Sequence, residues 1–340
     1  VDLCENDGKI SAMGEKGAAF IRENFSQQRL RDHVAQAYGR ITGRPMTPGS
    51  EAGAAQPSPT KAQAIGAALP CTIVIPVYNA PDEVAACIAS VIKHTNLQET
   101  QVLVIDDGSP DPAIAPLLDR FAGTPGLTIM RSPRNLGYTK TINLGIAQAA
   151  GRDVVLLNSD TVVTPRWLEG LRATAYSRSQ VGTVTAMGDN AGAFSFPLHN
   201  QKCDKPDHLT HEEYALMMVQ AAVDCAAPEV PTGSGFCMYI RRAMMDACGT
   251  FDEEGFPRGY GEENDFCMRA MKAGWVNLIS PWAFVFHIRT ASFKGEKDKL
   301  VKEGVDVVMK RYPDYTRLVK AAFSGPDMMA LREATARAVI

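Results

Sequence analysis

Asp160 closes a polar triplet that follows directly after an apolar segment. Val154–Leu157 has the composition of a buried strand, and the chain then continues with Asn158, Ser159 and Asp160. In α/β proteins, ligands bind at the carboxyl ends of parallel strands. A carboxylate there is costly to bury unpaired, so we expect Asp160 to hold a hard cation whose other oxygen ligands come from water and a phosphate. A helix N-cap before Pro165 is the alternative for Asp160 taken alone.

Two adjacent aspartates follow a second apolar segment, Val102–Ile105. At the end of a parallel strand, Asp106 and Asp107 could hydrogen-bond a ribose or a base N–H. An Asx turn that caps the next helix explains the same two residues equally well. Another apolar segment ends at Val77, and the ring of Tyr78 just beyond it could stack on a base. For Tyr78 alone, an ordinary turn is the simpler interpretation.

Asn135, Lys140 and Asn143 lie around the start of a predicted helix. Lys140 and Asn143 are three residues apart, so they share one face of that helix. A basic and an amide side chain near a helix N-terminus suit a phosphate group. A solvated first turn of a helix explains them equally well.

A group of acids follows two glycines. Glu262, Glu263 and Asp265 come directly after Gly259–Gly261, and glycines there suggest a loop shaped for close approach. The helix macrodipole favours acids at a helix N-terminus, and Asp265 can pair with Arg269 one turn later. A carboxylate crowded by like charges gains proton affinity and can act as a base. Different acids of the group can stabilise the helix and accept a proton.

His287 ends the apolar segment Phe284–Phe286. A single histidine at a strand end is more often structural than functional. If it converges with Asp160, a second ligand for the same metal ion becomes the better explanation.

From Cys71 onward, apolar segments of strand length alternate with helical patterns. This order predicts an α/β fold with a mostly parallel sheet and helices on both faces. A polar stretch, 188–209, interrupts the pattern and is long enough to be suspected of a function. The predicted strands are 72–77, 101–105, 127–131, 154–157, 181–187, 236–240, 276–279 and 284–287, and the predicted helices are 82–93, 138–150, 165–176, one opened by the capping box at 210–213, and a helical region after 294.

The composition limits the class of protein. The chain has 340 residues, 45% of them apolar, and a formal net charge of −3. It can therefore build a sizeable core and presents no global basic field for nucleic acid. Its eight cysteines show no close pairing, which indicates a reducing compartment without a disulfide framework. No apolar stretch reaches the roughly 18 residues of a membrane span, and we expect a cytoplasmic protein.

The sequence pattern divides the chain into four parts. Residues 1–42 have helical spacing, 43–70 have the composition of a flexible linker, 71–295 carry the α/β pattern, and 296–340 form helical appendages. The chain does not begin with methionine and its first helix has an apolar stripe. We therefore expect a fragment of a longer polypeptide, with residues 1–42 as the tail of a preceding domain.

These segments, in this order, resemble glycosyltransferase family 2, whose members have the GT-A fold with a Rossmann-like sheet and use nucleotide-sugar donors. The similarity is strongest to the bacterial branch that builds O-antigen and other envelope polysaccharides, including rhamnosyltransferases. It runs from Cys71 to Phe293. The matching segments are IPVYNA (75–80), VIDDGSPD (104–111), NLGYTKTINLGI (135–146), LLNSDT (156–161), GFCMYIRR (235–242), GTFDE (249–253), GEENDFCMRAMKAGW (261–275) and FHIRTASF (286–293).

The resemblance implies a role for each matching residue. Asn158–Asp160 corresponds to the family's Asp-x-Asp metal motif, so Asp160 becomes the main carboxylate ligand of Mg²⁺ or Mn²⁺, and His287 binds metal or diphosphate. Glu263 matches the family's base, and Asp265 matches the second acid of that motif. The positions that match donor-binding residues of the family are Val77, Tyr78, Asp106, Asp107, Asn135, Lys140, Asn143, Asn158, Ser159 and Gly235.

The resemblance also implies a reaction and partners. It predicts inverting, metal-dependent transfer from a UDP-, dTDP- or GDP-sugar to a glycan or lipid-linked glycan in envelope polysaccharide synthesis, with the cytoplasmic face of the inner membrane as one location. The Gln-x-x-Arg-Trp signature of processive synthases does not occur in the sequence, which favours adding one or few sugars. Residues 20–41 resemble the closing helix of a two-Rossmann (GT-B) transferase, so a second transferase domain in tandem is expected. A nucleotidyltransferase and a non-catalytic nucleotide-sugar or glycan-binding module are the alternatives.

Overall fold

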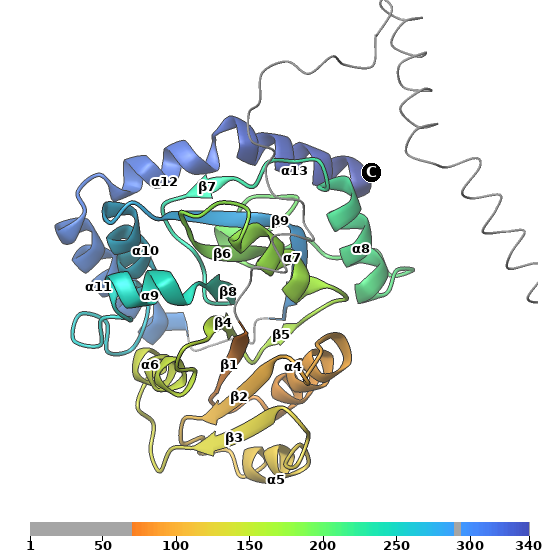
Figure 1. Ribbon diagram of the computed structural model, residues 1–340, viewed down its shortest axis with the longest axis vertical. Helices are drawn as coiled ribbons and strands as arrows, with labels where there is room; N and C mark the ends of the chain where they lie inside the picture. Colours follow the sequence, from red (N-terminus) through yellow and green to blue (C-terminus); the bar gives the residue numbers. More distant parts are fainter. Residues whose placement is uncertain (1–69, 289–293, 340) are drawn as a thin grey trace, which may run out of the picture. The chain divides into compact units, whose positions relative to one another are not determined.

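The computed structural model describes residues 70–288 and 294–339 (Figure 1). The chain divides into two units, Val1–Pro57 and Ser58–Ile340, and every described residue belongs to the second. The predicted helix of residues 1–42 lies outside the described residues, as does the predicted linker of 43–70 apart from Pro70. Both expectations, and that of a preceding transferase domain, stay predictions.

A central sheet of nine strands organises the described unit (Figure 1). The strands are β1 (Cys71–Val77), β2 (Gln101–Asp106), β3 (Leu127–Arg131), β4 (Asp153–Leu157), β5 (Thr161–Val162), β6 (Val181–Gly188), β7 (Glu229–Val230), β8 (Cys237–Ile240) and β9 (Val276–His287). Their order is β3-β2-β1-β4-β8-β6-β9-β5, and β7 pairs with β9. Parallel pairs join β1 to β2 and β4, β2 to β3, and β6 to β9. Because β8 runs antiparallel between β4 and β6, β1–β4, β6 and β9 all point one way, which confirms the predicted mostly parallel α/β sheet.

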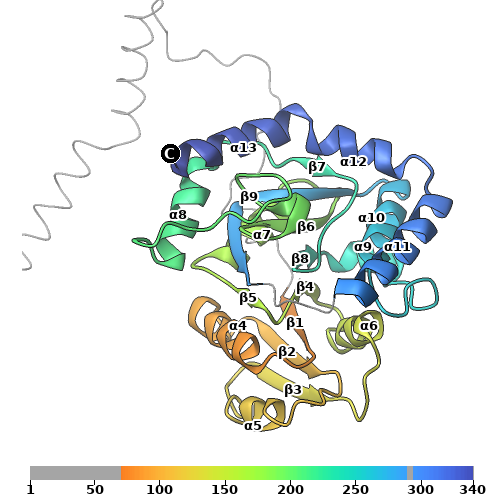
Figure 2. The same cartoon turned by 180° about the vertical axis from the view of Figure 1, so that it is seen from behind.

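Helices cover both faces of this sheet. They are α4 (Pro81–His94), α5 (Ile114–Asp119), α6 (Tyr138–Gln148), α7 (Trp167–Ala175), the 3-10 helix η1 (Gly192–Phe194), α8 (His211–Ala221), α9 (Arg242–Cys248), α10 (Glu262–Lys272), α11 (Lys294–Arg311), α12 (Tyr315–Phe323) and α13 (Pro326–Val339). Because successive strand residues face opposite sides, Ile73 and Ile75 pack with α4 and α7, whereas Val74 packs with α6 and α10. Figures 1 and 2 show α4 and α6 on opposite sides of β1–β3. None of the helices in the described ranges combines the length and apolar composition needed to cross a bilayer.

One prediction about the strands is wrong in detail. The predicted strands 276–279 and 284–287 are a single strand, β9, because the backbone stays extended through the polar and proline-containing residues between them. The register against β6 shifts here, since Ala186 pairs with Ser280 and Met187 with Phe284. The irregularity carries β9 on to His287, at the same edge of the sheet as the carboxyl ends of β1, β2, β4 and β6.

Helix α11 packs closely on the backbone that leads into α10. A Cβ atom on Gly304 would clash with the carbonyl oxygen of Tyr260, and one on Gly261 would lie 2.6 Å from Cε1 of Phe256. Gly261 also has a φ of 146°, which side-chain-bearing residues rarely adopt. These two glycines let α11 cover the turn that carries Glu262.

Candidate active site

Asp160 and His287 lie together at the ends of β4 and β9. Nε2 of His287 is 3.2 Å from Oδ1 of Asp160. The two side chains therefore converge, which favours a role for both as ligands of one metal ion. The buried His287 ring stacks on Phe236, with ring centroids 5.4 Å apart and 19° between the planes. Its Nδ1 is buried and has no hydrogen-bond partner among the described residues. Since buried polar atoms are normally satisfied, this histidine fits a site completed by a ligand.

Asp189 joins this pair and was not identified from the sequence. It follows β6 and is buried, and its Oδ1 accepts a 2.7 Å hydrogen bond from the backbone N–H of His287. Burial raises the pKa of the Asp189 carboxyl, and that hydrogen bond opposes the shift. The signal was available, because the predicted strand 181–187 runs into Gly188 and Asp189 just as other strands run into polar residues.

The side chains at this edge are of the kind that could supply some of the ligands of a divalent cation. Within the described ranges, no group of three or more His, Cys, Asp and Glu side chains is arranged to hold a metal. Asp160 and His287 would therefore supply only part of a coordination shell, and a phosphate and water would supply the rest. Asn158, in place of the first acid of the expected motif, is consistent with such a small set of protein ligands.

Asn158 and Ser159 form the turn between β4 and Asp160, and both are partly buried. The backbone N–H of Asn158 donates to the carbonyl oxygen of Phe236 at 3.0 Å. The carbonyl oxygen of Asn158 accepts a 2.7 Å hydrogen bond from the hydroxyl of Thr161. These bonds fix the backbone that presents Asp160.

Asp107 connects the end of β2 with the start of α6. Its Oδ1 accepts from the N–H of Leu136 at 2.7 Å, and its Oδ2 accepts from the N–H of Gly137 at 3.0 Å. Oδ1 of Asn135 accepts from the same N–H of Gly137 at 2.8 Å. Asp107 and Asn135 therefore hold the loop that leads into Tyr138, and any contact of theirs with a nucleoside stays a prediction.

Asp106 forms a turn, whereas Tyr78 is exposed. Oδ1 of Asp106 accepts from the N–H of Ser109 at 2.9 Å. Of the two roles that the sequence allowed for Asp106, the turn is therefore present. Val77 is the buried last residue of β1, and its carbonyl oxygen accepts from the N–H of Asp107 at 2.9 Å. Tyr78, directly after it, is 49% exposed, which leaves its ring accessible to a base.

Asn143 holds the segment that follows α9. Its Nδ2 donates to the carbonyl oxygen of Phe251 at 2.9 Å and to Oε1 of Glu253 at 2.8 Å, and its Oδ1 accepts from the N–H of Phe251 at 3.1 Å. Both ends of the amide are thus engaged within the protein. Lys140, on the same helix, is exposed. A direct contact of either residue with a donor substrate stays a prediction.

Gly235 and Glu263 are in direct contact. The N–H of Gly235 donates to Oε1 of Glu263 at 2.6 Å. A Cβ atom on residue 235 would clash with that carboxylate oxygen and would lie 2.5 Å from the hydroxyl oxygen of Tyr138. Position 235 must therefore be glycine if Glu263 and Tyr138 are both to approach it.

Burial raises the pKa of both Glu262 and Glu263 above the ordinary value for glutamate. Glu262 is 4% exposed, and its Oε2 accepts from the N–H of Gly261 at 2.9 Å, which opposes the shift. For Glu263, the negative charge of Glu262 adds to the effect of burial. The pair thus has the high proton affinity expected of crowded carboxylates.

Tyr138 links the acid pair with the Asp160 side of the site. Burial raises the pKa of its hydroxyl well above the usual value, and the negative charges of Glu263, Glu262 and Asp160 raise it further. The negative charges of the Glu262–Glu263 pair and of Asp160 therefore all affect the pKa of this one hydroxyl. Tyr138 lies in the matching segment 135–146, but the sequence assigned it no role.

Asp265 serves packing and charge pairing. It is 1% exposed. Its Oδ2 is 2.9 Å from Nε of Arg269, which confirms the predicted pair one turn apart. Its Oδ1 accepts from Nη1 of Arg311 at 2.8 Å and from the hydroxyl of Tyr312 at 3.0 Å. Both oxygens are occupied by protein donors, so Asp265 ties α10 to α11.

A cavity of about 340 Å³ lies between the 255–259 segment and α11. One of its lining residues is Gly259, where a Cβ atom would lie 3.6 Å from Oε1 of Glu262. The cavity therefore adjoins the acid pair. Its other lining residues are Gly255, Phe256, Pro257, Arg258, Lys299, Leu300, Glu303, Gly304 and Val307.

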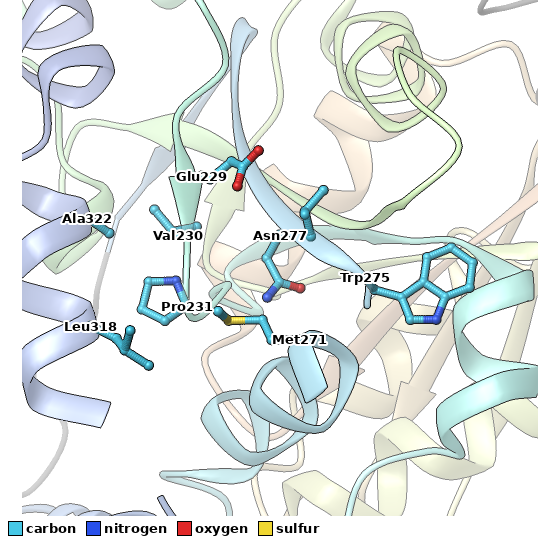
Figure 3. A pocket seen from close by; sticks show the side chains of 9 residues that line it. Glu229, Val230, Pro231, Met271, Trp275, Asn277, Leu318 and Ala322 are labelled. Atoms are coloured by element: carbon cyan, nitrogen blue, oxygen red, sulfur yellow. The ribbon is translucent and has the colours of Figure 1, made fainter. Parts of the chain in front are cut away.

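A smaller hollow of about 130 Å³ lies where β7, β9, α10 and α12 meet (Figure 3). Its wall is mostly apolar, with Pro231, Met271 and Leu318 among the side chains that Figure 3 labels. Its polar side chains are engaged, because Glu229 pairs with Arg178 and Asn277 accepts from Thr183. This hollow offers no chemistry.

The sequence matches a known family. The family model described as glycosyl transferase family 2 matches residues 72–249, more than half of the chain. An N-acetylglucosaminyltransferase of Sinorhizobium fredii is 30% identical over 219 residues, which cover 62% of this chain and 51% of that protein. An N-acetylglucosaminyl-diphospho-decaprenol L-rhamnosyltransferase of Mycobacterium tuberculosis is 26% identical over 214 residues, which cover 56% of this chain and 67% of that protein. The chain spans about half the length of the N-acetylglucosaminyltransferases that it matches.

Two solved structures share the fold. GalNAc-T7 with UDP, GalNAc and Mn²⁺ aligns with a TM-score of 0.56 and 18% identity over 79% of this chain and 55% of its own. The mannosyltransferase PcManGT from Pyrobaculum calidifontis, in complex with GDP-Man and Mn²⁺, aligns with a TM-score of 0.54 and 16% identity over 94% of this chain and 84% of its own. At these identities the likeness shows the fold, and it confirms the expected GT-A architecture.

Asp265→Asn should lower the free energy of unfolding by about 1.5–3 kcal/mol, the usual contribution of hydrogen bonds to a charged group. The substitution removes the charge that Arg269 and Arg311 share. Denaturant unfolding of the full chain would measure the change. Asp246→Asn is the matched control, because Asp246 faces Arg242 at the same helical spacing but is 67% exposed and 3.9 Å away. Equal stability of the two variants would contradict the packing role of Asp265.

Proposed function

Since the chain belongs to glycosyl transferase family 2, we propose that it transfers a sugar from a nucleoside-diphosphate donor to a hydroxyl group of a glycan or lipid-linked glycan, with inversion at the anomeric carbon. One observation carries this proposal. The adjacent residues Gly235 and Phe236 contact both parts of the site, because the N–H of Gly235 donates to Glu263 and the ring of Phe236 stacks on His287, 3.2 Å from Asp160. A base and a diphosphate site at one place are what sugar transfer to a hydroxyl requires.

Glu263 is the proposed proton acceptor. It takes the proton of the acceptor hydroxyl while that oxygen bonds to the anomeric carbon and the bond from this carbon to the diphosphate oxygen breaks. A base works best when its pKa is close to the working pH, and burial with the charge of Glu262 raises the pKa of Glu263 in that direction. The N–H of Gly235 fixes the orientation of its carboxylate. Asp265 has no part in this step, because protein donors hold both of its oxygens.

Asp160 and His287 are proposed to hold Mg²⁺ or Mn²⁺ together with the donor diphosphate. When bound, the cation would neutralise the charge that gathers on the leaving diphosphate. The chain's own contribution is orientation, because Asp189 holds the backbone of His287 and Phe236 supports its ring. The Mn²⁺ in both structural neighbours supports this proposal.

A nucleotide sugar as donor is supported by the UDP and GDP-Man in the two structural neighbours. A lipid-linked acceptor in envelope polysaccharide synthesis is supported by the name of the Mycobacterium tuberculosis relative, which includes a diphospho-decaprenol. We propose that the acceptor reaches Glu263 across the cavity beside Gly259, where Arg258, Lys299 and Glu303 offer polar groups. The cytoplasmic face of the inner membrane is the proposed location for this reaction.

Asp160→Ala should abolish the metal-dependent part of nucleotide binding. The variant lacks the carboxylate that would hold the cation, so Mn²⁺ should no longer strengthen binding of UDP or GDP by the several kcal/mol expected of a cation that neutralises the diphosphate. Calorimetry with Mn²⁺ and with EDTA would measure the difference. Asp204→Ala is the control, because Asp204 is 74% exposed and should leave the Mn²⁺ effect intact. An unchanged Mn²⁺ effect in Asp160→Ala would rule out Asp160 as the metal ligand.

Glu263→Gln keeps the shape and the hydrogen bond of the side chain but removes its ability to accept a proton. Turnover of the best donor from a screen of UDP-, dTDP- and GDP-sugars should fall by about 10²–10⁴-fold, the usual contribution of a general base. Donor affinity should stay that of the wild type, because the base acts on the acceptor. Glu254→Gln, on the exposed loop nearby, should retain full turnover. Wild-type turnover in Glu263→Gln would remove Glu263 as the base.

A further inference from the structure

Tyr138 is held rigidly at the centre of the site. It is the first residue of α6, and it follows Gly137, whose φ of 87° starts the helix sharply. The carboxylate of Asp107 holds the two N–H groups directly before it, those of Leu136 and Gly137. On the other side, a Cβ atom on Gly259 would lie 3.6 Å from Cβ of Tyr138. The ring therefore has little freedom to leave this position.

The hydroxyl of Tyr138 is left without a partner within the described ranges, where it makes no hydrogen bond. It lies against Gly235, since a Cβ atom there would be only 2.5 Å from it. The acids whose negative charges raise the pKa of this hydroxyl are Glu263 and Glu262 from α10 and Asp160 after β4. Tyr138 is partly exposed, so its hydroxyl can form a hydrogen bond with a ligand oxygen that enters beside Gly235.

Tyr138 is also the neutral donor among these acids. Their negative charges, together with burial, raise the pKa of its hydroxyl, so it keeps its proton over the working range of an enzyme. Ionised carboxylates only accept hydrogen bonds, whereas a protonated tyrosine can donate one. A ligand oxygen that enters this space can therefore accept from Tyr138.

We propose that the Tyr138 hydroxyl donates a hydrogen bond to a ring hydroxyl of the transferred sugar and thereby helps to select the donor. This inference rests on the proposed sugar transfer. In that reaction the sugar is joined to the diphosphate held near Asp160, and its anomeric carbon must come within reach of the acceptor oxygen beside Glu263. The hydroxyl of Tyr138 lies beside Gly235, whose N–H donates to Glu263 and whose neighbour Phe236 stacks on His287. A sugar ring held between these two places therefore comes close to that hydroxyl.

The rival role for Tyr138 is to orient Glu263. The two side chains approach Gly235 together, and a hydrogen bond from Tyr138 to the carboxylate would stabilise its ionised form. In that case, loss of the hydroxyl would slow all donors equally and would move the acidic limb of the pH profile upward. A contact with the sugar predicts neither effect.

The test combines Tyr138→Phe with donor analogues. The wild type is first screened for turnover of UDP-, dTDP- and GDP-sugars, and the best donor is then compared with its monodeoxy and epimeric analogues. For one analogue, wild-type kcat/KM should drop by about 3–10-fold, the equivalent of one neutral hydrogen bond. With the parent donor, kcat/KM of Tyr138→Phe should be lower than that of the wild type by the same factor. With that analogue, kcat/KM of Tyr138→Phe should equal that of the wild type. Binding of the free nucleoside diphosphate and the unfolding temperature should stay unchanged, and so should the kinetics of the control Tyr260→Phe.

The outcomes separate this inference from the proposed function. If the wild type turns over none of the donors, the sugar-transfer proposal fails, and this inference fails with it. The wild type could be active while the ratio of kcat/KM for the parent donor to kcat/KM for each analogue is the same in Tyr138→Phe as in the wild type. That result would overturn only the inference. A uniform loss with a shifted pH profile would also overturn it, in favour of the orienting role.

Discussion

The placement of two adjacent glutamates, Glu262 buried and Glu263 partly buried, is the constraint around which this site is organised. Glu262 and Glu263 are raised in proton affinity by burial, and Glu263 also by its neighbour's charge. Such a pair is unfavourable unless backbone N–H groups reach it. Gly261 and Gly235 supply those groups at 2.9 and 2.6 Å. A side chain at Gly235 would collide with the Glu263 carboxylate, so the nearby glycines follow from the position of the acids.

The rest of the site holds this arrangement in place from three directions. Helix α11 covers the turn before α10 through Gly304, and the contacts of Asp265 with Arg311 lock the two helices together. Asp107 fixes the loop that presents Tyr138. The end of β9 brings His287 to Asp160 only because the strand continues through an irregular register with β6. Some polar side chains that the sequence assigned to ligand binding or catalysis, such as Asp107 and Asp265, are instead hydrogen-bonded within the protein and support the site.

Much of the fold and the location of the site could be predicted from the sequence, because strands, helices and the polar residues that follow strands are local patterns. Apolar segments that end in polar residues located the sheet edge, but for His287 the sequence left a structural role and convergence with Asp160 both open. What the sequence could not provide are contacts between distant segments. Nothing local shows that the amide of Asn143 is engaged by Phe251, 108 residues away, or that both oxygens of Asp265 face protein donors. Tyr138 was missed for the same reason, since its importance comes from its proximity to Gly235.

The pH dependence of kcat/KM, measured for the wild type and for Glu262→Gln, tests the central claim most directly. A base works only when ionised, so activity should fall as the pH drops through the pKa of Glu263. Because burial and Glu262 raise that pKa, the wild-type acidic limb should lie well above about pH 4.3, the ordinary value for glutamate. In Glu262→Gln one cause of the shift is removed, and the limb should move to lower pH while activity at high pH persists. An acidic limb at the ordinary value, or one that stays in place in Glu262→Gln, would contradict the account.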